Sequence, residues 1–170
     1  MATYSQLDRL SSKQNFLLVY PEGLNAMWAA IDVDPETLDA NPDVRFFDAL
    51  LEHIASQYVI DRERIYLIGM SNGASFVQLL ANARSSDIAA VVACSGPRPR
   101  ALNDCQPAVP TLLIVGGDDF AAGSVQSDLE YYRAAGHDAQ LIVVRGLGHE
   151  WSRPHNADAW AFMADRQLSL

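Results

Sequence analysis

The sequence has few basic residues for its length. Its 12 lysines and arginines stand against 21 aspartates and glutamates, which gives a formal net charge of −9. Nucleic acids and anionic membranes both require a positively charged contact surface. The shortage of basic residues therefore predicts that neither of them is a partner of this chain.

Long apolar segments are also missing. Residues 1–14 contain neither an apolar stretch of signal-peptide length nor a positively charged leader. The longest apolar runs, such as Ile88–Cys94 and Val109–Val115, are far shorter than the roughly 20 residues of a membrane-spanning helix. We expect a cytoplasmic protein; a secreted origin stays open if the chain is truncated at its N-terminus.

Cysteine is scarce, with Cys94 and Cys105 alone. Two cysteines make no disulfide framework, although they could pair in an oxidising compartment. Cys94 ends an apolar run and is expected to be buried, whereas Cys105 lies in a proline-rich loop. No histidine or cysteine spacing fits a metal site, and no glycine fingerprint for phosphate is present. No metal and no cofactor are predicted.

The composition is that of an ordinary globular protein, with 49% hydrophobic residues in 170. A chain of this length buries roughly 70% of its unfolded surface, so residues 1–170 are predicted to form a single domain. Short apolar runs predict strands at Phe16–Tyr20, Ile65–Ile68, Ala89–Cys94, Leu112–Val115 and Leu141–Val144. Helices are expected at Val44–Tyr58, Asn72–Ala83, Ser127–Ala135 and Ala157–Leu168.

This alternation predicts an α/β fold, in which helices cover both faces of a mostly parallel sheet and form a three-layer sandwich. Right-handed crossovers place the carboxyl ends of all strands at one edge. Ligand chemistry in such sheets collects at that edge. Residues that directly follow a predicted strand are therefore the first candidates for a site.

Ser71 is the strongest candidate. Gly69-Met70-Ser71-Asn72-Gly73 follows a predicted strand directly and begins a helix, which is the setting of a nucleophile elbow. The turn exposes the serine Oγ above the sheet edge. The N–H of Asn72, at the helix N-terminus, is placed to stabilise an oxyanion.

A serine nucleophile needs a base and an orienting acid. His149 follows the last predicted strand in a loop with two glycines, whereas His53, His137 and His155 are most simply surface residues. Asp118 and Asp119 follow the strand before it. Neighbouring residues leaving a strand point opposite ways, so only one carboxylate can face the histidine. The chain order serine, aspartate, histidine is that of α/β-hydrolases.

Three segments resemble one family. FLLVYPEG (16–23), IDRERIYLIGMSNG (60–73) and GLGHEW (146–151) are similar to the polyhydroxybutyrate depolymerase and feruloyl or acetylxylan esterase group. The resemblance implies an α/β-hydrolase serine esterase. Its Gly-x-x-Asp pattern assigns the orienting acid to Asp119 rather than Asp118.

The sequence departs from that family at its beginning. Members carry, before the YPEG strand, a further strand that ends in a His-Gly loop and supplies a second oxyanion N–H. This chain begins at what resembles the next helix, Thr3–Lys13. Tyr20, Asn25 or a nearby backbone amide are left as substitutes. The missing strand would lie inside the sheet, so either the sheet closes up or a second subunit fills the gap, which predicts a homodimer or larger homo-oligomer.

Trp28 and Trp151 lie near predicted loops of the active edge. They are interpreted either as walls of the substrate pocket or as core packing.

The predicted function is hydrolysis of a carboxylic ester, on small or aryl-type acyl esters, through an acyl-enzyme. Two alternatives stay open: a peptidase or lactonase with the same triad, and a hydrolase-derived binding protein that has lost turnover.

Overall fold

The computed structural model describes residues 1–168, without the side chain of Asn25, and contains one parallel sheet of four strands. The strands lie in chain order across the sheet: β1 (Tyr66–Met70), β2 (Ala90–Cys94), β3 (Thr111–Gly116) and β4 (Ala139–Val144). Each strand begins and ends within two residues of the bounds that the sequence predicted for it.

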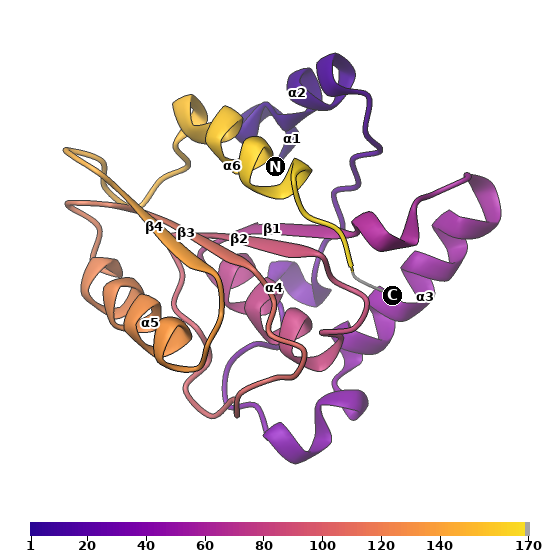
Figure 1. Cartoon of the computed structure of the whole chain (residues 1–170), viewed down its shortest axis with the longest axis horizontal. Coiled ribbons are helices and arrows are strands. Elements are labelled where there is room, and N and C mark those ends of the chain that lie inside the picture. Colours follow the sequence, from indigo (N-terminus) through magenta and orange to yellow (C-terminus); the bar gives the residue numbers. More distant parts are fainter. Residues whose placement is uncertain (169–170) are drawn as a thin grey trace.

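Helices cover both faces of this sheet, which confirms the predicted three-layer α/β fold (Figure 1). One face carries α4 (Asn72–Ala83) and α5 (Ala122–Ala134), and the opposite face carries α6 (Asn156–Ala164) with α1 (Ala2–Ser5) and α2 (Leu7–Gln14). A longer helix, α3 (Pro42–Gln57), packs beside α4. Short 3-10 turns complete the chain at Leu24–Ala26, Pro35–Ala40, Arg62–Arg64 and Arg153–His155.

The strand β2 shows why the strands read as continuous apolar runs. Val91 and Ala93 face the α4 and α5 side, whereas Val92 and Cys94 face α6. All five residues of the strand are buried, because a central parallel strand is covered on both sides.

Capping residues, which the hydrophobic periodicity does not reveal, set the helix boundaries. Asn41 caps α3 by accepting hydrogen bonds from the N–H groups of Asp43 and Val44, and Pro42 occupies the first helical position. The helix therefore begins two residues before the predicted start. The expected helix at Thr3–Lys13 is divided in two at Gln6, whose backbone is left-handed with φ 59°. No helix within residues 1–168 is long and apolar enough to cross a membrane.

The predicted strand Phe16–Tyr20 is wrong, because this segment is extended but bonds to no strand of the sheet. Its alternate side chains still point inward: Phe16 stacks on Trp160 with ring centroids 4.3 Å apart, and Leu18 packs against the buried cluster under α6. An apolar run thus also arises where extended chain packs alternate side chains against the core without pairing in the sheet.

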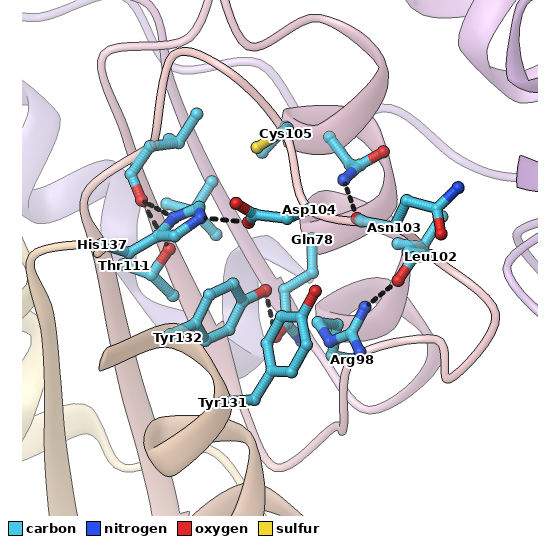
Figure 2. Close-up of a pocket in the computed structure, with 14 residues that line it drawn as sticks. Gln78, Arg98, Leu102, Asn103, Asp104, Cys105, Thr111, Tyr131, Tyr132 and His137 are labelled. Atoms are coloured by element: carbon cyan, nitrogen blue, oxygen red, sulfur yellow. Dashed lines mark hydrogen bonds and ion pairs between the residues drawn. The ribbon is translucent and has the colours of Figure 1, made fainter. Parts of the chain in front are cut away.

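A network of buried polar groups fastens the loop 97–110 to α4 and α5 around a cavity of about 20 Å³, room for about one water molecule (Figure 2). Arg98 donates to the carbonyl of Leu102 at 2.7 Å, and its guanidinium lies 3.8 Å from the Tyr131 ring centroid. His137 contacts Asp104 at 2.8 Å and the Val109 carbonyl at 3.1 Å. His137 is therefore buried as part of this network, not a surface residue as the sequence suggested.

The two cysteines lie on opposite sides of the sheet. Cys94 belongs to the cluster under α6, whereas Cys105 packs against the cluster under α4 and α5, and both are free. The pairing that the sequence left open is therefore contradicted, since the sheet separates the two sulfurs. Burial raises the pKa of the Cys94 thiol to about 12.

We predict that the native protein forms no internal disulfide under mild oxidation and that Cys94 resists iodoacetamide at neutral pH. The reason is that the thiolate is the reacting species and burial suppresses it. Peptide mass spectrometry before and after unfolding measures both reactions, with Cys105→Ser as the control. A peptide that links Cys94 to Cys105 in the native protein would contradict the placement of the two sulfurs on opposite sides of the sheet.

Candidate active site

Ser71 occupies the sharp turn between β1 and α4. Its backbone has φ 55° and ψ −122°, a conformation that side chains rarely adopt, and its N–H donates to the Cys94 carbonyl at 2.9 Å. The turn also brings Gly69 against the first turn of α4, where a Cβ on Gly69 would overlap the Gly73 carbonyl. Glycine at position 69 is thus a steric requirement of the turn that presents the Ser71 hydroxyl, whereas a Cβ on Gly73 would meet only the Trp28 ring, at 3.8 Å.

His149 reaches Ser71 from the loop after β4. The imidazole Nε2 lies 2.9 Å from Ser71 Oγ, so the hydroxyl can donate to an unprotonated Nε2. The loop packs closely on the end of β3, where a Cβ on Gly116 would overlap the Leu147 carbonyl. A glycine at the end of β3 therefore fixes how near the histidine loop comes to the aspartate that follows this strand.

Asp119 completes the chain of hydrogen bonds. Its carboxylate oxygens lie 3.0 and 3.1 Å from His149 Nδ1, and the Ala121 N–H donates to Oδ1 at 2.8 Å. Burial opposes ionisation of this 6% exposed residue, but hydrogen bonds from Ala121, Ser95 and His149 together hold the pKa of Asp119 below its ordinary value. The buried group is consequently a carboxylate that can fix the imidazole tautomer.

The structure separates the two neighbouring aspartates. Asp118 is exposed and its backbone N–H donates to the Leu147 carbonyl at 3.0 Å, so its side chain leaves the site. The geometry therefore matches the choice of Asp119 that the family resemblance implied.

Asn72 contributes to the site in two ways. Its N–H lies at the beginning of α4, where a helix leaves its first donors without internal partners. Its side chain accepts from the Trp28 N–H at 2.7 Å and donates to the Trp28 carbonyl at 3.1 Å. This pair of bonds attaches the loop around Trp28 to the elbow.

The two tryptophans have different environments. Trp28 is half-buried beside the elbow and stacks on Phe76 with ring centroids 4.5 Å apart. Trp151 is 7% exposed in the core under α6, and its indole N–H donates to Asn156. The interpretation of Trp151 as a pocket wall is therefore wrong, because its ring is enclosed by the core.

Of the substitutes for a second oxyanion donor, Tyr20 makes a contact elsewhere. The Tyr20 hydroxyl lies 3.3 Å from Ser5 Oγ, in the packing of the N-terminal segment. The side chain of Asn25 lies outside what the structure describes. Within residues 1–168, no group of three histidine, cysteine or acidic residues could hold a metal ion.

Two residues of the site escaped the sequence analysis. Ser95 follows β2 directly, is 2% exposed and helps to hold the pKa of the Asp119 carboxyl below its ordinary value. Phe120 is the neighbour of Asp119 and stacks on the His149 ring. Position after a strand was a usable signal for Ser95, whereas no sequence pattern marked Phe120.

Comparison with known proteins gives one family. The model of the family described as Esterase PHB depolymerase matches residues 3–113, about two thirds of the chain. The matched range contains Ser71, but Asp119 and His149 lie beyond it. Their assignment therefore depends on the geometry of the site.

Individual relatives agree with this match. A bifunctional acetylxylan esterase/xylanase of Neocallimastix patriciarum is 27% identical over 134 residues, which cover 76% of this chain and 19% of that protein. Feruloyl esterase D of Neurospora crassa is 31% identical over 93 residues, covering 55% of this chain and 29% of that one. The chain thus spans less than a third of either relative.

Solved structures support the fold. A carboxylesterase from Mesorhizobium loti aligns with a TM-score of 0.62 at 18% identity, covering 77% of this chain and 63% of that one. The Bacillus cereus carboxylesterase gives 0.61 at 20% identity, covering 78% and 63%. Both alignments indicate an α/β-hydrolase architecture.

We predict that an alkyl fluorophosphonate labels Ser71 selectively. His149→Ala should slow labelling about 100-fold or more, because the hydroxyl loses its base. Intact-mass and peptide mass spectrometry measure the rate and the position, and Ser127→Ala, which changes an exposed serine of α5, serves as the control. Labelling at another serine, or at an unchanged rate without His149, would refute the site.

Proposed function

The chain belongs to the esterase PHB depolymerase family, and on that premise we propose that it hydrolyses carboxylic esters through an acyl-enzyme on Ser71. One observation carries the proposal. A continuous line of hydrogen bonds runs from Ser71 Oγ through both nitrogens of His149 to the buried Asp119 carboxylate. Ser71 itself stands on a strained turn at the N-terminus of α4.

In the first step, His149 Nε2 takes the Ser71 proton while Oγ attacks the ester carbonyl. The negative oxygen of the tetrahedral intermediate accepts a hydrogen bond from the Asn72 N–H and lies at the positive end of α4. The Nδ1 N–H of the imidazolium donates a hydrogen bond to the Asp119 carboxylate, and the negative charge of Asp119 stabilises the imidazolium. His149 then gives its proton to the alcohol oxygen, the C–O bond breaks, and the acyl group remains on Ser71.

In the second step, His149 takes a proton from water, and the hydroxide equivalent attacks the acyl carbonyl. The proton returns to Ser71 Oγ as the carboxylic acid leaves. The chain ends the cycle as it began, and this sequence of steps requires no cofactor.

We propose small or aryl-type acyl esters as the substrates. The family and the names of the two relatives, an acetylxylan esterase and a feruloyl esterase, favour an ester over an amide. Trp28, half-buried and joined to the elbow by Asn72, is the aromatic side chain that we propose as a wall of the acyl site.

We expect the protein to hydrolyse p-nitrophenyl acetate. Ser71→Ala should reduce the rate by about 10⁴-fold or more, as in other triads. Asp119→Asn should reduce it on the order of 10³-fold or more, because an amide permits the wrong imidazole tautomer. Asp118→Asn is the matched control and should stay within about 3-fold, since its side chain is exposed. A Ser71→Ala protein of unchanged activity would exclude the proposed reaction, and equal losses for the two aspartates would move the acid elsewhere.

We also propose that residues 1–170 act as one domain that pairs with a second copy through the open edge of β1. On the β2 side of β1, the Ile65 carbonyl accepts a hydrogen bond and the Ser71 N–H donates one. Backbone groups alternate in direction along a strand, so those of the even-numbered residues of β1 face the opposite edge. No strand within residues 1–168 pairs there. Exposed apolar side chains of the preceding segment add to this surface: Leu17, Val19, Tyr20, Leu24, Met27 and Ile31.

A cytoplasmic location stays a prediction.

Light scattering at micromolar concentration should give about twice the chain mass of 18.6 kDa. Val19→Lys should shift the protein toward the monomer, because it places a charge among the exposed apolar side chains. Val143→Lys, which changes a comparably exposed position on β4, should leave the mass unchanged. A monomer at every concentration would show that the β1 edge needs no partner.

A further inference from the structure

Phe120 is an exposed aromatic residue at the centre of the candidate site. It lies in the turn between Asp119 and α5, and 83% of it is exposed. Two hydrogen bonds between its neighbours span Phe120, from the Ala121 N–H to Asp119 Oδ1 at 2.8 Å and from the Ala122 N–H to the Asp119 carbonyl at 3.0 Å. A rigid turn therefore presents an apolar ring to solvent.

The ring is placed against the proposed base. Phe120 and His149 have ring centroids 4.5 Å apart and planes inclined by 29°, which is a stacked arrangement. Both nitrogens of His149 are engaged in the plane of the imidazole, by Asp119 and by Ser71. Phe120 therefore covers one face of the imidazole and leaves the proton path open.

Single apolar residues on a protein surface are ordinary and need no explanation. The position of Phe120 separates it from the others. In the proposed reaction, His149 Nε2 gives its proton to the alcohol oxygen, so that oxygen must come within about 3 Å of the imidazole. The group attached to the oxygen then lies beside the ring that covers the imidazole.

We propose that Phe120 is a specificity-determining residue, which receives the alcohol part of the ester and favours a flat, apolar group there. The inference rests on the proposed esterase function. The group that Phe120 receives is an aromatic alcohol moiety, because stacked or edge-to-face aromatic pairs gain free energy beyond that of burying their surface. The ring surface offered to this moiety is the part of Phe120 that the imidazole does not cover.

The test compares two acetates that differ only in the alcohol, benzyl acetate and ethyl acetate. The ratio of their kcat/KM values cancels changes that affect every ester. In Phe120→Ala this ratio should fall about 5-fold to 10-fold, mainly through a higher KM for benzyl acetate. Phe120→Trp should keep the ratio within about 2-fold, because it preserves an aromatic surface.

Two controls complete the experiment. Tyr58→Ala, which removes an aromatic ring of 59% exposure from the end of α3, should leave the ratio unchanged. A second pair, ethyl phenylacetate and ethyl acetate, varies the acyl part instead, and its ratio should not respond to Phe120→Ala.

The outcomes are distinguishable. An unchanged benzyl-to-ethyl ratio in Phe120→Ala, with both esters hydrolysed, overturns the role of Phe120 and leaves the esterase proposal intact. A change confined to the acyl pair also overturns it, since the ring would then face the other side of the substrate. If the unaltered protein hydrolyses none of these esters, the proposed function fails and the inference fails with it.

Discussion

The sharp turn between β1 and α4 is the constraint on which the site depends. Ser71 keeps an unfavourable backbone conformation because β1 is bonded to β2 on one side and α4 is packed against the sheet on the other. Such strain costs on the order of 1–3 kcal/mol, and it persists only where the surroundings determine the backbone. The turn places the proposed nucleophile and the N-terminus of α4 at one point, so His149 and Asp119 need only converge on it.

A buried negative charge is the second requirement of the arrangement. The Asp119 side chain has no exposed surface, which would favour its protonated form, yet donors from three elements keep its pKa low. Ser95 comes from the end of β2, Ala121 from the start of α5 and His149 from the loop after β4. The carboxylate therefore joins neighbouring strand ends, and its hydrogen bonds fix the histidine and the sheet edge together.

The sequence predicted most of this edge and less of what surrounds it. Apolar runs located all four strands of the sheet, and the Gly-x-Ser-x-Gly turn located Ser71, because both patterns follow from local geometry. Phe16–Tyr20 was misassigned, since strand pairing depends on a neighbour that a run of side chains does not report. Phe120 had no local signature at all. Its contact with His149 arises only when two loops, separated by β4, meet at the same edge.

The proposed oxyanion site draws on the N-terminus of α4. The Asn72 side chain is committed to the Trp28 backbone, and the Tyr20 hydroxyl lies against Ser5, so neither reaches the reacting oxygen through a described contact. The donors that the described geometry offers are the Asn72 N–H and the positive end of α4. A single oxyanion donor is worth about 3 kcal/mol, and this figure already contains part of the helix-end effect, because the positive charge of the helix end resides on the same N–H groups. Charge stabilisation by α4 is thus the contribution that we assign to the oxyanion in the proposed acyl transfer at Ser71.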